Sequence, residues 1–239
     1  MPSLPTPLPP AERTVGQLVA ETIRAYGGHF WLALPLGLPL AVVDQFSVHH
    51  GAGHQRLVYW SATPGIVAAY LLACWIVLRR PPTRAAVAVA LLVYLPFPAL
   101  RSIYVLPAVA WFAFIGLAVP AAMVENLGFR ASLIRGRQLG VADYAHSLGA
   151  LAALVVVVGV SAEALSALLH TQGDNGQRVA VFLSELVLSP LLYLGGALLY
   201  LDQAARVGSG PSKRRSRDAD LHPPVDDDAA GHPDPQVEP

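Results

Sequence analysis

Long, almost uninterrupted apolar runs are the feature that most constrains how this chain can fold. Four of them, at 61–78, 103–124, 147–169 and 179–201, each supply about the 17 to 25 residues that cross a ~30 Å hydrocarbon core. Hydrophobic residues make up 54% of the chain and charged residues only 13%, whereas about one-quarter of a soluble domain is charged. We therefore expect an all-α integral membrane protein, because helices satisfy their own backbone hydrogen bonds in lipid.

Two further apolar runs, both interrupted by prolines, bring the expected bundle to about six transmembrane helices. The run at 30–48 contains Pro35, Pro39 and Asp44, and the run at 85–100 contains Pro96 and Pro98. Prolines kink such helices and free carbonyl groups that neighbouring helices must then satisfy. For the second run, two arrangements remain open: either 85–100 spans on its own, or 85–124 forms a re-entrant unit.

The segments on either side of these runs have a different composition. The first residues, 1–11, are rich in proline and predict a disordered leader. Residues 12–28 place apolar side chains on one helical face, which predicts an amphipathic interfacial helix before the six-span domain at 29–205. The remainder, 206–239, has a basic cluster followed by an acidic, proline-containing end. We expect it to be a disordered cytoplasmic tail, because it has too little apolar content to fold.

The distribution of basic residues predicts the orientation of the bundle. With six spans and a cytoplasmic N-terminus, thirteen of the sixteen basic residues lie on the cytoplasmic side, and only Arg56, Arg101 and Arg178 lie outside. This asymmetry is typical of proteins of the bacterial cytoplasmic membrane. We therefore expect a multi-pass protein of the cell membrane with both termini in the cytoplasm.

Several cytoplasmic arginines are expected to bind the anionic headgroups of membrane lipids. These residues are Arg79, Arg80, Arg84, Arg130, Arg135, Arg137, Arg214 and Arg215. Glu125 lies among them at the end of an apolar run. We expect Glu125 to form an ion pair with Arg130 or with an arginine of the 79–84 loop; the alternative is a solvated carboxylate at a helix end.

Three stretches of the sequence resemble a known family. The stretches are PAAMVENLGFRASLIRGRQL, RTVGQLVAETIRAYGGHF and LLYLDQAARVG. Together they resemble the glycerophosphoryl diester phosphodiesterase membrane-domain family, and the resemblance covers roughly 13–208. The chain keeps the glutamate, arginine and leucine of the family pattern at Glu125, Arg135 and Leu139, with Gly136 in place of a serine. The resemblance implies a six-helix bacterial membrane protein.

Several classes of enzyme have no matching motif in this sequence. It contains no phosphate loop, no His-Glu-x-x-His, no Gly-x-Ser-x-Gly and no paired cysteines, since Cys74 is the only cysteine. A phosphodiesterase domain of the named type is a barrel of ~250 residues, and each segment outside the apolar runs is shorter than about forty residues. We expect no catalytic site and no cofactor, and the zero net charge gives no sign of a nucleic-acid partner.

Ionisable residues inside the expected spans are candidates for function, because burying charge in a bilayer is costly. Asp44, Glu163 and Glu185 all fall in the outer half of the expected bundle. Glu163 and Glu185 have matching depths on consecutive spans, and if these two helices are antiparallel neighbours, the two carboxylates could share a proton or a cation. Hydrogen bonding to serines or backbone is the structural alternative.

Histidines near the outer side form a second candidate set, comprising His49, His50, His54 and His170. Beside the carboxylates they could bind a metal or relay protons, although loop histidines are commonly just solvated. No metal site is predicted from their spacing. Tyr59, close to the same border, reads as an interfacial anchor.

We expect a membrane module without catalysis of its own, which organises lipid or a membrane or cytoplasmic protein partner. Two alternatives stay open: a small proton- or cation-coupled permease that uses the outer-half carboxylates, and an intramembrane metal-dependent enzyme that uses the histidines. A membrane module is expected to have no solute cavity, whereas a permease is expected to have a cavity that reaches the middle of the membrane.

Overall fold

The computed structural model describes residues 9–47, 52–169 and 173–208. Helices account for nearly all of these residues, and none of them is in a strand. The elements are η1 (Pro10–Glu12), α1 (Val15–Gly28), α2 (Phe30–Ala33), η2 (Leu34–Gly37), α3 (Leu38–Ser47), α4 (Ala52–Leu78), α5 (Arg84–Tyr94), α6 (Phe97–Ile103), α7 (Val105–Ile115), α8 (Ala118–Val124), α9 (Phe129–Ala142), α10 (Tyr144–Leu169), α11 (Gly173–Leu188) and α12 (Pro190–Gly208).

The predicted all-α bundle of about six membrane-crossing helices is confirmed. Within the described residues, six helical stretches are long and apolar enough to cross a membrane: Phe30–Ser47, Gly53–Leu78, Arg84–Arg101, Val105–Val124, Tyr144–Leu165 and Arg178–Gly208. Arg84–Arg101 and Val105–Val124 each qualify separately, so 85–124 provides two stretches of spanning length. The last three residues of α12, 206–208, were expected to begin the tail, but they continue the helix.

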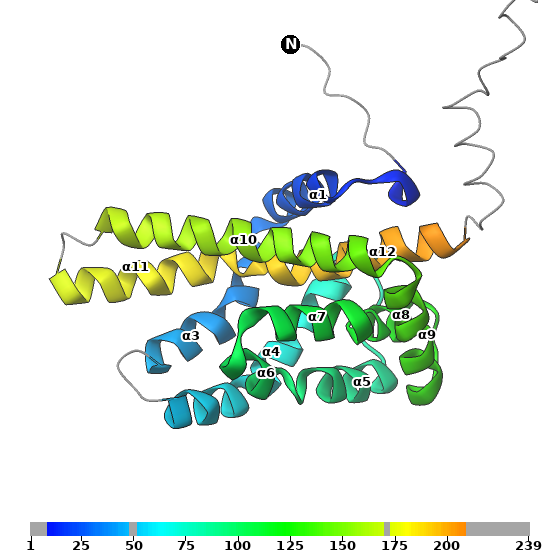
Figure 1. Cartoon of the computed structure of the whole chain (residues 1–239), viewed down its shortest axis with the longest axis horizontal. Coiled ribbons are helices and arrows are strands. Elements are labelled where there is room, and N and C mark those ends of the chain that lie inside the picture. The colour runs from blue at the N-terminus through cyan, green and yellow to red at the C-terminus, as the bar shows by residue number, and fades with distance from the viewer. Residues whose placement is uncertain (1–8, 48–51, 170–172, 209–239) are drawn as a thin grey trace, which may run out of the picture. The chain divides into compact units, whose positions relative to one another are not determined.

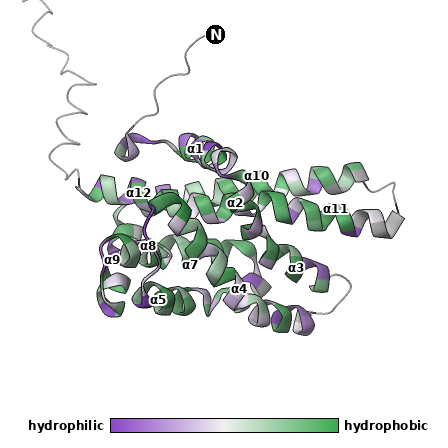
Figure 2. Ribbon diagram, turned by 180° about the vertical axis from the view of Figure 1, so that it is seen from behind, coloured by the Kyte–Doolittle hydropathy of each residue, from purple (hydrophilic) through white to green (hydrophobic). Residues whose placement is uncertain are grey.

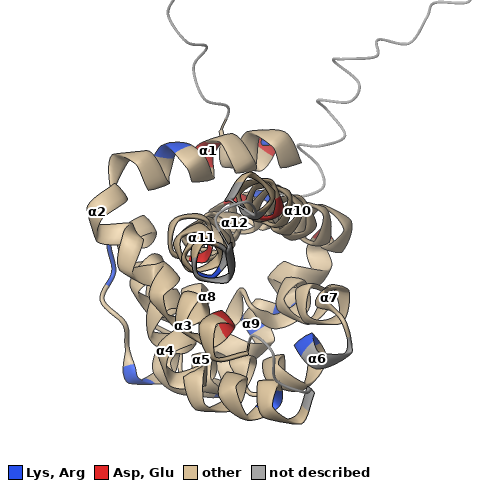
Figure 3. Ribbon diagram, turned by 90° about the vertical axis from the view of Figure 1, so that its left-hand side faces the viewer, with Lys and Arg blue, Asp and Glu red and all other residues tan. Residues whose placement is uncertain are grey.

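The helices run back and forth along the long axis of the bundle (Figure 1). We call the end where α10 stops and α11 starts the α10–α11 end; α3 stops and α4 starts on the same side. The opposite end, where α8 leads into α9, is the α9 end. Seen from the α10–α11 end, most of the ribbon carries no charged residue (Figure 3), as expected of helices that face lipid or each other.

Prolines break several of the six stretches into shorter helices. Pro120 has no N–H to donate to the carbonyl of Gly116, four residues earlier, and the helix is interrupted there between α7 and α8. The hydroxyl of Tyr70 reaches this carbonyl from α4 at 3.5 Å. The carbonyl freed by this break therefore has a polar partner inside the bundle, the Tyr70 hydroxyl, which lipid could not supply.

A second break lets two helices approach closely. Pro190 follows Leu186 by four residues and cannot donate to its carbonyl, and here α11 gives way to α12. Gly37 packs against that carbonyl so tightly that an added Cβ would lie 2.2 Å from the oxygen. The absence of a side chain at Gly37 thus brings the chain just before α3 directly against the end of α11.

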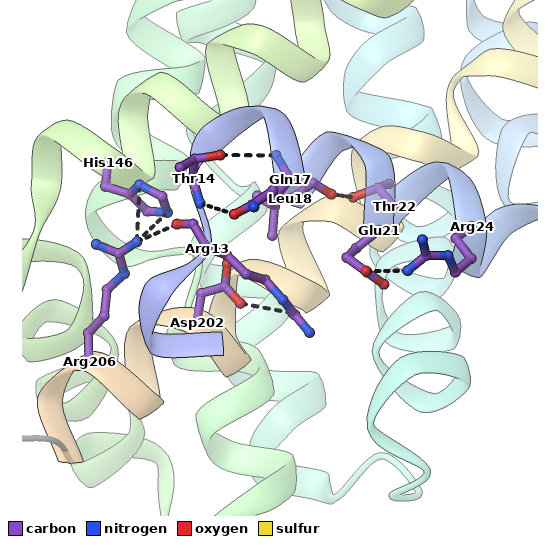
Figure 4. Close-up of polar contacts among 10 residues, drawn as sticks. All are labelled: Arg13, Thr14, Gln17, Leu18, Glu21, Thr22, Arg24, His146, Asp202 and Arg206. Atoms are coloured by element: carbon purple, nitrogen blue, oxygen red, sulfur yellow. Dashed lines mark hydrogen bonds and ion pairs between the residues drawn. The ribbon is translucent and has the colours of Figure 1, made fainter. Parts of the chain in front are cut away.

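The helix α1 is bound to the bundle by its own N-terminus. Thr14 and Gln17 form a capping box, in which each side chain binds the other residue's backbone N–H. Beside it, Arg13 donates to Asp202 at 3.0 Å, and Arg206 donates to the carbonyl of Arg13 at 2.6 Å (Figure 4). The buried face of α1 consists of Leu18, Thr22 and Tyr26, so the expected amphipathic helix packs on the protein through its apolar side.

The helix α9 lies across the bundle axis at the α9 end, and hydrophilic residues gather there (Figure 2). Gly136 and Gly140 form its buried face together with Ser132 and Leu139. A Cβ on Gly136 would lie 2.4 Å from the backbone nitrogen of Ala118, so α9 packs on α8 at backbone distance.

Candidate functional site

A chamber of about 290 Å³ lies inside the bundle, between its two hydrophobic cores. All six candidate spans contribute to its lining, which is mostly apolar. It extends to Ile66, Tyr94 and Phe112, which lie near the middle of their spans. Its volume is close to the lower end of the range of about 300 to 1,000 Å³ found for ligand pockets.

Aromatic rings form the deep part of this chamber. The ring centroids of Tyr94 and Phe112 are 5.5 Å apart, and Tyr70 packs behind both rings at 5.7 and 5.1 Å. Phe97 extends the cluster at 5.9 Å from Tyr94. Tilted and edge-on contacts at these distances are favourable, so packed aromatic rings form the inner wall of the chamber.

A smaller polar cavity of about 120 Å³, which we call the vestibule, adjoins the chamber on the side of the α10–α11 end. Asp44, Tyr59 and Arg101 line both the chamber and the vestibule. These three residues therefore stand at the boundary between a polar space and an apolar one. Arg56 and Ser47 line the vestibule only.

The boundary carries a pair of carboxyl groups. Asp44 on α3 lies within side-chain hydrogen-bonding reach of Glu185 on α11 and of Tyr59 on α4. Arg101 on α6 is close enough to interact electrostatically with the Asp44 carboxylate. The close contact of Gly37 with Leu186 holds these two helices together. A hydrogen bond of 2.7 Å from Gln45 to the carbonyl of Arg178 joins them again further along.

Two buried hydroxyl groups at this site have no hydrogen-bond partner among the described residues. The Tyr193 hydroxyl belongs to a side chain that is 5% exposed and lines the chamber. The Ser47 hydroxyl, on a residue that is 9% exposed, lines the vestibule. Buried polar groups are normally satisfied, so both spaces offer hydrogen-bonding capacity to a ligand or to water.

No protein-family model, curated protein or solved structure matches this chain. The six-helix family suggested by the three sequence stretches therefore stays an expectation, and the chemistry of the site rests on its own residues.

The predicted pairing of Glu163 with Glu185 is wrong. Glu185 faces Asp44 instead, because α11 packs against α3 as well as α10. Glu163 is exposed. It lies one turn beyond Gly159, which lines the chamber, so its side chain is past the α10–α11 end of that space. Two of the three candidate carboxylates thus come together, and the third does not join them.

The histidines give no metal centre among the residues that the structure describes, where no three His, Cys, Asp or Glu side chains gather. His54 is exposed on α4. His49, His50 and His170 lie outside the described residues, so the prediction for them remains untested.

Glu125 forms an ion pair, but its predicted partners are wrong. Arg135 donates through Nε to both carboxylate oxygens, at 2.9 and 3.0 Å, and Tyr200 donates its hydroxyl at 3.1 Å. Arg130 and Arg135 are five residues apart on α9, or about 140° around a helix. Only Arg135 faces Glu125, while Arg130 is on the exposed side.

The other arginines expected at the lipid headgroups have mixed surroundings. Arg80, Arg84 and Arg137 are exposed, although the guanidinium of Arg137 also lies 5.9 Å from the ring centroid of Phe114. Arg79 is exposed, and its Nη2 lies 2.6 Å from Nε2 of His29. Arg214 and Arg215 are outside the described residues.

Sequence reasoning missed three boundary and chamber residues. Arg101 was predicted only to lie outside and Tyr59 only to be an interfacial anchor, whereas the structure brings both next to Asp44. Nothing in the sequence indicated a role for Tyr193 at the site, because a tyrosine in an apolar run is expected to pack against other helices. Pairing these residues with Asp44 requires knowledge of how distant helices pack, which periodicity does not give.

Proposed function

We propose that this chain is a small permease of the cell membrane whose chamber holds an amphipathic organic molecule. The observation that carries the proposal is a mostly apolar chamber that begins at a carboxyl pair and ends on aromatic rings near mid-span. An apolar body fits the chamber, and a polar end fits the boundary. Breaks in several spans also favour transport, because discontinuous helices commonly build transporter sites.

The proposed orientation puts the α9 end and both termini in the cytoplasm. The excess of arginine and lysine on that side supports it. The vestibule then faces the outside. Exposed Arg80, Arg84, Arg130 and Arg137 would contact anionic headgroups of the inner leaflet.

A module that organises lipid or a partner protein, the function first expected from the sequence, is the second candidate. The exposed arginines favour it, but it leaves the chamber without a use. The two functions differ in whether a small amphiphile occupies the chamber.

Calorimetric titration of hexan-1-ol into the protein in lipid nanodiscs tests the proposal. We expect saturable binding in addition to partitioning into the lipid. Replacing Val158 by tryptophan fills the chamber, because Val158 lines it and is 6% exposed. This variant should lose the saturable component.

The matched control is Val160→Trp, on the same helix but facing outward with 64% exposure. It should bind hexan-1-ol as the unmodified protein does. Equal heats for all three proteins, explained by the lipid alone, would overturn the proposal and favour the module.

A further inference from the structure

The charges at the boundary do not balance when every group is ionised. Asp44 and Glu185 are acidic, and Arg101 supplies the cation that acts on both. Among the residues that the structure describes, the remaining titratable groups facing the pair are the tyrosines Tyr59 on α4 and Tyr193 on α12. Arg56 and Arg101 are both exposed, but Arg56 lines the vestibule only, and of the two arginines Arg101 alone acts on both carboxyl groups.

One extra positive charge makes this boundary neutral. With both carboxylates ionised, Asp44, Glu185 and Arg101 leave a net charge of about −1, which is costly between membrane helices. Two adjacent carboxylates also repel each other. A proton held between them removes both penalties, and a bound monovalent cation would do the same.

The chamber wall indicates what kind of cation fits. Five aromatic residues line it, namely Tyr59, Tyr94, Phe97, Phe112 and Tyr193, and aromatic faces attract organic cations. The unpartnered hydroxyl oxygen of Tyr193 can accept a hydrogen bond from an ammonium group. An anionic head would instead meet two carboxyl groups at the same boundary.

We propose that the chamber binds an alkylammonium ion in exchange for one proton from the Asp44–Glu185 pair. This inference rests on the proposed function and names its ligand class. The ammonium group replaces the shared proton between the carboxylates, and the proton leaves to water through the vestibule. The alkyl chain lies against the apolar wall. No covalent bond changes other than the O–H bond of the carboxyl group.

The test is calorimetric binding of hexylammonium to the whole protein in nanodiscs of zwitterionic lipid. Titrations at one pH in two buffers with different ionisation enthalpies give the number of protons released. We expect release of about one proton per cation bound, and an affinity that rises up to about tenfold per pH unit while the pair is protonated.

Glu185→Gln removes one of the two carboxyls, and we expect at least a tenfold loss of affinity with no proton release. Glu163→Gln is the control, because Glu163 is exposed outside the chamber; it should behave like the unmodified protein. Tyr193→Phe keeps the ring and removes only the hydroxyl, and it should weaken hexylammonium binding several-fold. If Glu185→Gln does not fold, the proton count of the unmodified protein decides.

Two patterns would overturn the inference. In the first, hexan-1-ol binds, whereas hexylammonium either does not bind or binds without releasing a proton. In the second, hexyl phosphate binds more tightly than hexylammonium. Either pattern leaves the proposed permease standing with another ligand, whereas binding of no probe would remove both proposals.

Discussion

Asp202 is fully buried near the end of α12, and only one of its carboxylate oxygens has a hydrogen-bond partner among the described residues. That partner is Arg13, which precedes α1 and whose side chain is also largely buried, while Arg206 on α12 adds a second positive charge that acts on Asp202. Removing one member of a buried pair is much more destabilising than removing a surface pair.

We therefore expect Arg13→Met to lower the free energy of unfolding by about 3 kcal/mol, because it leaves the Asp202 carboxylate buried and unpaired. Denaturant unfolding in mixed micelles measures this change. The Arg13→Met/Asp202→Asn double variant should recover most of it, since the buried charge is then gone.

Arg24→Met is the matched control on the same helix. Its partner Glu21 is one turn away, and the Arg24 side chain is 55% exposed, so the loss should stay below about 0.5 kcal/mol. Equal losses for Arg13→Met and Arg24→Met would contradict the assigned role of the buried pair.

Residue chemistry in the sequence identified part of the site. Asp44 and Glu185 were both predicted as candidates, because ionisable groups in apolar runs stand out. Their pairing was not predicted, since Glu163 had a better match in depth and only the packing of α11 on α3 separates the two choices.

At the scale of elements, glycines decide how closely the helices approach. Gly136 of α9 lies on the backbone of Ala118, and Gly37 lies on the carbonyl of Leu186. The prolines that break the spans were visible in the sequence, but the partners of the freed carbonyls were not, because they come from other helices.

We expect Gly136→Ala to destabilise the protein by about 2 kcal/mol, because the new Cβ would overlap the backbone of α8. Thermal unfolding in detergent measures the effect. Gly16→Ala, in α1 with no atom within 4 Å of the added Cβ, is the control and should be neutral or slightly stabilising. A neutral Gly136→Ala would contradict the close packing of α9.

At the scale of the whole molecule, long apolar runs were enough to predict an all-α bundle and its six spanning stretches. They were not enough to predict the chamber. An apolar residue that lines a cavity and one that faces lipid look alike in sequence, and Val155 and Val156 on α10 are an example: the first lines the chamber, and the second is 61% exposed.

This pair of valines provides the most direct test of the central claim, a water-accessible chamber inside the bundle that opens outward. Val155→Cys and Val156→Cys would each be made in a Cys74→Ala background, which removes the only native cysteine. A small, positively charged methanethiosulfonate is then added outside intact spheroplasts. Because thiolates form only where water reaches, we predict that Val155→Cys reacts at least tenfold faster than Val156→Cys. Equally slow reaction at both positions would contradict the account.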